Sequence, residues 1–234
     1  MRTAKTVLTV IQERGKQKKP IERVYKLLFN RELYLNAYAK LYPNNGAMTK
    51  GVTNETVDGM SIQKIDRMIE ILREEKYQWK PARREYIKKK NGKKRPLGIP
   101  VWGDKVLQEV MRQILEAYYE PQFSEHSHGF RPNRGCHTAL QEIQVWKGTR
   151  WFIEGDISQY FDTIDHKILL EILARNIHDG RFIRLVSNML EAGYLEEWKF
   201  KQTISGVPQG GLCRARHKEP YDEIDVMPRY VQYS

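Results

Sequence analysis

Apolar residues recur along this chain with two different spacings, and each spacing predicts a type of secondary structure. Over residues 21–42, and again after Ser61, they cover one face of a 3.6-residue period, which predicts two amphipathic helices with Ser61 as an N-cap. A broader apolar stripe over residues 104–121 predicts a third, deeply buried helix. Two further helices are expected, one from about Asp165 and one from about Arg181.

Two other stretches predict strands. Asn91-Gly92 lies between the apolar residues at 86–87 and at 97–99, which is the order expected of a β-hairpin with a type I′ turn. Residues 151–157, with the sequence WFIEGDI, are typical of a short central strand that is buried on both faces. The order of helices, hairpin and strand predicts a helix-rich α+β fold.

Charge points to a polyanionic partner. The chain carries 40 Lys and Arg against 29 Asp and Glu, a net charge of +11, and nucleic acid fits this better than an anionic membrane surface. No apolar run reaches the roughly 18 residues of a membrane span, so we expect a cytoplasmic protein with no membrane partner. Residues 1–20 are polar and basic, and we expect a flexible arm there.

Cysteine and histidine residues give no metal-binding pattern. Cys136 and Cys213 are far apart, and we interpret both as incidental thiols. His126, His128 and His137 lie close to Cys136, but their spacing does not match that of a tetrahedral zinc site.

The predicted central strand carries the best candidate for metal chemistry. Asp156 lies at its C-terminal end, where a carboxylate is costly to bury without a metal ion, an arginine, a helix N-terminus or water. Tyr160 and Phe161 follow closely and could pack against a bound sugar, or could be ordinary core aromatic residues. Gln209, in the proline- and glycine-rich loop 205–211, could approach a ligand, although a plain turn is the more common meaning of such a loop.

Basic residues cluster at two places that suit phosphate contact. Residues 76–95 hold ten Lys and Arg against the single acid Glu85, and their density favours a triphosphate or nucleic-acid backbone over a solvated face. The loop 128–135 carries Arg131 and Arg134 between glycines, which suits phosphate contact or a structural role. The hairpin residues concerned are Lys88, Lys89, Lys93, Lys94 and Arg95.

Taken in order, five segments resemble the reverse transcriptases encoded by bacterial group II introns. Each segment alone is weak evidence of the family, and the five in this order are far more specific. The segments are residues 88–100, 104–108, 128–132, 155–162 and 206–211. The resemblance implies the fingers of a right-hand polymerase and an incomplete palm. The implied divisions are 1–20 (arm), 21–58 (N-terminal extension), 59–150 (fingers), 151–211 (partial palm) and 212–234 (divergent tail).

The resemblance also implies roles for single residues. Asp156 would be the first aspartate that binds magnesium, with the Ile157 backbone beside it and the triphosphate, and Phe161 would be the sugar gate. Lys89 and Arg95 would contact the triphosphate, while Gln209 would line the nucleotide pocket. Lys88, Lys93, Lys94, Arg131 and Arg134 are the expected RNA contacts. The implied partners are an RNA template or intron RNA, a DNA primer, deoxynucleotides and two Mg²⁺ ions.

The tail departs from the family pattern. After Gly211 the family continues with an aliphatic helix and a hairpin bearing Tyr-x-Asp-Asp, whereas residues 212–234 are polar and aperiodic. We interpret this as truncation or a frame shift, and expect this chain alone to be inactive. An RNA-binding, maturase-like fragment that assists splicing is the alternative function, and a decayed, poorly folded fragment is a third possibility.

Overall fold

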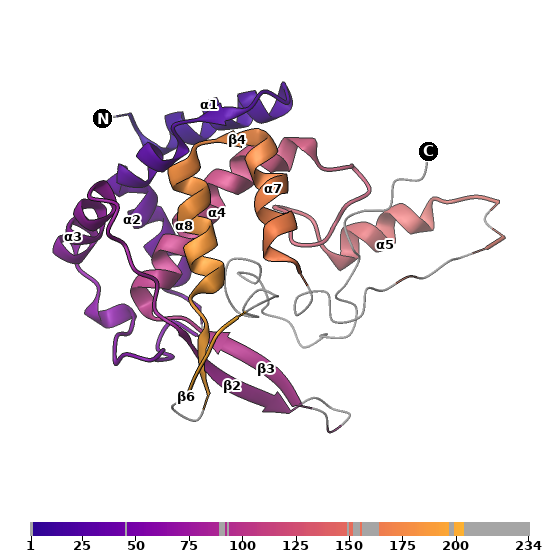
Figure 1. The fold of residues 1–234 in the computed structure, drawn as a ribbon. Coiled ribbons are helices and arrows are strands. Elements are labelled where there is room, and N and C mark those ends of the chain that lie inside the picture. Colours follow the sequence, from indigo (N-terminus) through magenta and orange to yellow (C-terminus); the bar gives the residue numbers. More distant parts are fainter. Residues whose placement is uncertain are drawn as a thin grey trace.

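The computed structural model describes residues 2–44, 46–88, 92, 94–148, 150, 151, 155, 164–196 and 199–203, and of Arg95 only the backbone. Helices make up most of this part of the chain, and a mixed sheet extends from them (Figure 1). The helices are α1 (Ala4–Lys16), α2 (Arg31–Leu41), α3 (Ile62–Arg73), α4 (Trp102–Tyr119), α5 (Cys136–Gln144), α7 (His166–Asn176) and α8 (Gly180–Glu191). Short 3₁₀ helices span η1 (Val24–Phe29), η2 (Val57–Gly59) and η3 (Glu120–Gln122).

The basic N-terminus is a docked helix, so the expectation of a flexible arm over residues 1–20 is wrong. Thr3 caps α1 by accepting a 3.2 Å hydrogen bond from the Thr6 amide. Ala4 and Ile11 are buried as α1 packs against α4. The segment is basic overall, but its few apolar residues lie on one face, and this face is enough to pack the helix on the core.

The region expected to be one helix over residues 21–42 is broken near its middle. Arg23 has a φ of 56°, and the 3₁₀ helix η1 begins directly after it. Asn30 then ends η1 and caps α2, because its side chain accepts a 3.0 Å hydrogen bond from the Glu32 amide. Asparagine is a strong N-cap, and at this position it starts a new helix instead of continuing the old one.

The helices expected after Ser61 and over residues 104–121 are present. Ser61 caps α3, with its hydroxyl 3.3 Å from the Lys64 amide. Helix α4 begins at Trp102 and forms the centre of the core, in contact with both α1 and α2. Its completely buried apolar residues are Val106, Leu107, Val110, Met111, Ile114 and Tyr118.

The last two expected helices are also present, with different degrees of burial. Asp165 caps α7 and Asp179 caps α8. Helix α8 buries the apolar residues expected of it, such as Phe182 and Leu185. On α7, however, Ile168 and Ile172 stay 57% and 45% exposed, so that helix covers less of the core than its spacing predicts.

The sheet is larger than a hairpin. Strands β2 (Ala82–Lys88) and β3 (Lys94–Ile99) pair antiparallel where the hairpin was expected, and Gly92 in the connection has a φ of 78°. Strand β5 (Tyr194–Glu196) joins β2 in parallel, and β6 (Lys199–Lys201) pairs antiparallel with β5, which gives the order β3-β2-β5-β6. A second, two-stranded parallel sheet joins β1 (Ile21–Glu22) to β4 (Ile177–His178). The expected strand over 151–157 lies largely outside the described residues.

The helices of the described ranges are too short or too polar to cross a membrane.

Candidate nucleic-acid interface

The hairpin places two of the expected RNA contacts opposite each other. Lys88 ends β2 and pairs in register with Lys94 at the start of β3, and both are exposed. The backbone of Arg95 pairs with Ile87 one position further along. Two ammonium groups at the turn end of a hairpin give a compact positive charge in solvent, which suits phosphate contact.

Several other expected site residues fall where the structure gives no description. They are Lys89, Lys93, Asp156, Ile157, Phe161 and Gln209. Their roles therefore stay predictions. Among the residues that are described, no group of three or more His, Cys, Asp or Glu could hold a metal ion.

Buried contacts from α4 fix the segment that leads into the hairpin. Asp104 lies in the first turn of α4 and is only 3% exposed. Its carboxylate accepts a 2.6 Å hydrogen bond from the Tyr77 hydroxyl and a 3.0 Å bond from the Lys80 amide. Burial raises the pKa of Asp104 to about 6, while the bonds from Tyr77 and Lys80 oppose that rise.

Helix α8 holds the same segment from the other side. The indole Nε1 of Trp79 donates a 3.0 Å hydrogen bond to the backbone carbonyl of Leu185. The rings of Trp79 and Tyr77 also pack edge to face, with their centroids 5.2 Å apart. Residues 77–80 are thus held to both α4 and α8 directly before β2, so the base of the hairpin has a defined position.

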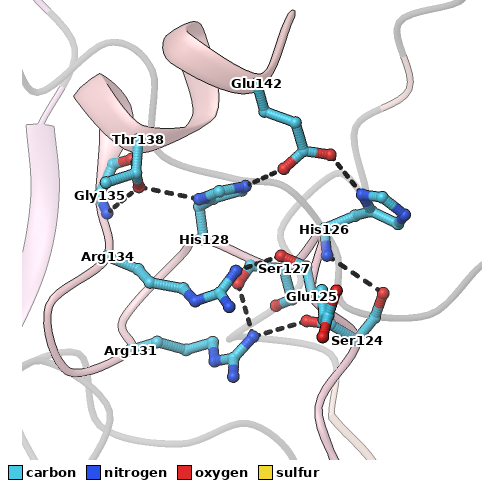
Figure 2. A network of polar contacts seen from close by, with 10 residues as sticks. All are labelled: Ser124, Glu125, His126, Ser127, His128, Arg131, Arg134, Gly135, Thr138 and Glu142. Atoms are coloured by element: carbon cyan, nitrogen blue, oxygen red, sulfur yellow. Dashed lines mark hydrogen bonds and ion pairs between the residues drawn. The ribbon is translucent and has the colours of Figure 1, made fainter.

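Arg131 has a structural position in the loop before α5 (Figure 2). It is 7% exposed and donates from Nη1 to the carbonyl oxygens of Ser124 and Ser127, at 2.5 and 2.9 Å. Its Nε bonds Glu120 at 2.9 Å. These contacts fold the loop back on itself, and they weigh against the RNA contact expected of Arg131. Arg134 is more exposed and donates to the Glu125 carbonyl.

The same loop joins two histidines to one acid. His128 lies between Glu142 and Thr138, with Nε2 2.7 Å from Glu142 and Nδ1 2.8 Å from Thr138 Oγ1 (Figure 2). His126 bonds the other oxygen of Glu142, and these two hydrogen bonds lower the pKa of that carboxyl. The cluster ties the loop to α5. Cys136 at the start of α5 is an exposed free thiol, and Cys213 lies outside the described residues.

A face of the sheet joins the expected Lys88 and Lys94 to further basic and aromatic residues that were not predicted from the sequence. Side chains alternate along a strand, so every second residue of β2 shares a face, and the register extends this face over β3, β5 and β6. We call this surface the basic sheet face. Its charged and aromatic residues, which lie beside Ala82, Pro96 and Gly98, are Arg84, Tyr86, Lys88, Lys94, Tyr194, Glu196, Lys199 and Lys201. The alternation of Arg84, Tyr86 and Lys88 was the available signal.

Comparison with known proteins finds a reverse transcriptase family and proteins encoded in introns. The profile of a family described as "Reverse transcriptase (RNA-dependent DNA polymerase)" matches residues 87–213, more than half of the chain. The chain is 50% identical over 192 residues to "Group II intron-encoded protein LtrA" of Lactococcus lactis subsp. cremoris, covering 81% of this chain and 32% of that protein. It is 46% identical over 217 residues to an "Uncharacterized 91 kDa protein in cob intron" of Schizosaccharomyces pombe, covering 89% and 27%.

A solved structure resembles the fold. A chain of the structure titled "Partial Cas6-RT-Cas1--Cas2 complex" matches with a TM-score of 0.54 at 19% identity, covering 81% of this chain and 32% of that one. At this identity the likeness concerns the fold alone. This chain spans about a third of the length of these relatives.

Proposed function

The chain belongs to the reverse transcriptase (RNA-dependent DNA polymerase) family, among the proteins encoded by group II introns, and on this basis we propose that it forms the fingers and early palm of an RNA-directed DNA polymerase. The match over residues 87–213 is the observation that carries the proposal. It includes the turn and second strand of the basic hairpin and all five of the segments that resemble the family. The exposed lysines at the turn end of β2 and β3 support a nucleic-acid partner.

The proposed nucleotide site combines an acid with basic residues from the fingers. Asp156 and the backbone of Ile157 would hold Mg²⁺, which when bound neutralises the charge of the phosphates. Lys89 and Arg95 contact the triphosphate. Phe161 limits the space beside the sugar and so favours a deoxynucleotide. A further residue, Gln209, lines the nucleotide pocket.

The proposed reaction is phosphoryl transfer. The 3′-hydroxyl of a DNA primer attacks the α-phosphate of the deoxynucleotide in line, forming a phosphodiester bond, and pyrophosphate leaves. Residues of the chain orient the nucleotide and balance its charge, and base pairing with the RNA template selects it. The fixed base of the hairpin, held by Asp104 and Trp79, positions the fingers for this task.

RNA binding involves the exposed cations of the hairpin in this proposal. Lys88, Lys93 and Lys94 contact phosphates of the template or of intron RNA, and Arg134 contributes from the loop before α5. The region 21–58 serves as the N-terminal extension that helps to hold RNA. Arg131 is left out of this set, because its guanidinium is already used within its own loop.

The test is nucleotide binding by the whole chain, because binding does not require a complete catalytic site. We expect deoxynucleotide binding that depends on Mg²⁺ and is weakened at least tenfold by Asp156→Asn, measured by equilibrium titration. Arg95→Gln should weaken the binding of a deoxynucleoside triphosphate and leave that of a deoxynucleoside unchanged. Asp58→Asn is the matched control, since Asp58 is an exposed residue of η2 and the charge changes equally.

Two outcomes would contradict this function. Equal nucleotide binding by wild type and Asp156→Asn would remove Asp156 from the site. RNA binding without any Mg²⁺-dependent nucleotide binding would favour the splicing fragment over the polymerase part.

A further inference from the structure

The basic sheet face carries a strong excess of positive charge. Its eight charged and aromatic residues include five Lys and Arg, and Glu196 is the single acid among them. The carboxylate of Glu196 already accepts from Lys201 and from the Tyr86 hydroxyl. The acid is therefore engaged within the face, and the remaining lysines at positions 88, 94 and 199 point a net positive charge to solvent.

Two tyrosines give this face flat aromatic surface. The guanidinium carbon of Arg84 lies 4.2 Å from the ring centroid of Tyr194 and 5.9 Å from that of Tyr86. The bond from the Tyr86 hydroxyl to Glu196 fixes the orientation of its ring, which stays 47% exposed. A ring that is held in place and open to solvent loses little conformational entropy when a base stacks on it.

The opposite face of the same sheet has different chemistry. Ile87 and Phe200 are 51% and 60% exposed there, and two leucines share that face. Charged residues lie on it too: Arg83 and Glu85 form an ion pair with each other, and the register adds the position of Arg95. The two faces therefore differ in composition: the opposite face mixes apolar and charged residues, and the basic sheet face carries an excess of cations around two tyrosines. Cations placed beside stacking rings are the pattern used to bind single-stranded nucleic acid.

We propose that the basic sheet face binds a single strand of RNA, with a base stacked on Tyr86 and phosphates on Lys88, Lys94 and Lys199. This rests on the proposed function, in which the strand with unpaired bases is RNA while the DNA primer is paired. Stacking on Tyr86 needs an unpaired base, so an RNA duplex should not bind at this site in the same way as a single strand. The site adds Tyr86, Tyr194 and Lys199 to the contacts expected from the hairpin alone.

The test uses the whole chain and a 16-nucleotide, dye-labelled oligouridine, with binding followed by fluorescence anisotropy at several salt concentrations. Tyr86→Leu should weaken binding about fivefold or more, because stacking contributes about 1–3 kcal/mol per base. Tyr86→Phe keeps the ring but loses the bond to Glu196, so it should bind more tightly than Tyr86→Leu and somewhat more weakly than wild type. Lys199→Gln should lower the slope of log K against log salt by about 0.7, the value for one phosphate contact on a single strand.

Lys64→Gln is the matched control, because it removes the same charge from an exposed position on α3 and should leave the salt slope near that of wild type. Crosslinking of 5-iodouridine RNA to the wild-type chain gives a second readout that does not depend on the folding of a variant. We expect crosslinked peptides that contain Tyr86 or Tyr194. A duplex of equal length should compete poorly.

The outcomes separate this site from the proposed function. If wild type binds no RNA, both fail. If wild type binds RNA, but Tyr86→Leu and Lys199→Gln behave as Lys64→Gln does and the crosslinks fall elsewhere, the basic sheet face is excluded while the polymerase proposal stands. Tighter binding of a 16-nucleotide DNA strand through the same residues would overturn the assignment of RNA.

Discussion

The hydroxyl of Tyr77 donates a 2.6 Å hydrogen bond to the buried carboxylate of Asp104 and so joins the start of α4 to the segment that leads into the hairpin. Burial raises the pKa of Asp104 from 3.8 to about 6, in spite of this bond. The folded state therefore holds the Asp104 proton more tightly than the unfolded state does. The stability contributed by this group is greatest below about pH 4 and falls as the pH rises towards 6.

The first prediction concerns this pH dependence. Between pH 4 and 7 the difference in unfolding free energy between wild type and Asp104→Asn should change by up to about 3 kcal/mol. Wild type becomes less stable relative to the variant as the pH rises. Urea unfolding at several pH values measures this. Tyr77→Phe removes a bond that favours the carboxylate, so it should move the midpoint of the Asp104 titration, followed by NMR, to higher pH. An Asp104 midpoint near 4 in wild type would contradict this account.

The second prediction concerns the close packing of α1 on α4. A Cβ atom on Gly15 would lie 2.0 Å from the backbone carbonyl oxygen of Tyr118, and a backbone atom cannot turn away. Gly15→Ala should therefore destabilise the chain by about 1–3 kcal/mol, the usual range for overpacking. Thermal and urea unfolding would measure the loss.

Gly180→Ala is the control for this substitution. Gly180 is the first residue of α8, and nothing lies within 4 Å of the Cβ that it lacks. Alanine there should be neutral or stabilise the chain by about 0.5–1 kcal/mol, because it favours helix. Equal effects of the two substitutions would mean that α1 does not pack on α4 as closely as the structure shows.

Local signals in the sequence predicted those helices that begin at a clear N-cap and follow a simple apolar period. Ser61 and Asp165 are examples, and the helices α3 and α7 follow them directly. The prediction was wrong where composition masked the period, as in α1, and where Asn30 interrupts a longer apolar pattern. Helix α1 is held by its packing on α4, and α2 begins where it does because Asn30 caps it. The spacing of apolar residues alone reveals neither contact.

Strands β5 and β6 could not be predicted, because each has three residues and depends on a partner that is distant in sequence. Tyr194 pairs with Ala82, so the basic sheet face combines residues more than one hundred positions apart. The contacts of a single residue, such as Arg131, are equally hard to predict from its sequence neighbours. Its sequence context suits phosphate contact, whereas its contacts with Glu120 and nearby carbonyls bury it.

The third prediction separates two helix caps of different burial. Asp179 accepts from the Arg181 amide at 3.1 Å as the cap of α8, and it also accepts a 2.9 Å bond from the Tyr25 amide, 154 residues away in sequence. Asp179→Ala leaves a buried amide without its partner in addition to the lost cap. The expected loss is about 2–4 kcal/mol of unfolding free energy.

Asp165→Ala is the comparison, because Asp165 is exposed and caps α7 through a single 3.0 Å bond from the Ile168 amide. Loss of this cap should lower the unfolding free energy by about 1 kcal/mol. Urea unfolding of both variants gives the difference. If the two variants lose equal stability, the bond between Asp179 and Tyr25 does not contribute, and the joining of η1 to α8 must rest on apolar packing alone.

The fourth prediction concerns polymerisation by this chain alone. The two magnesium ions of phosphoryl transfer need several carboxylate oxygens, and the 234-residue sequence contains no pair of adjacent aspartates. We therefore expect no primer extension above background with an RNA template, a DNA primer, deoxynucleotides and Mg²⁺, although nucleotide and RNA binding are retained. Extension that is abolished by Asp156→Asn and retained in Asp58→Asn would show that other residues of this chain complete the site.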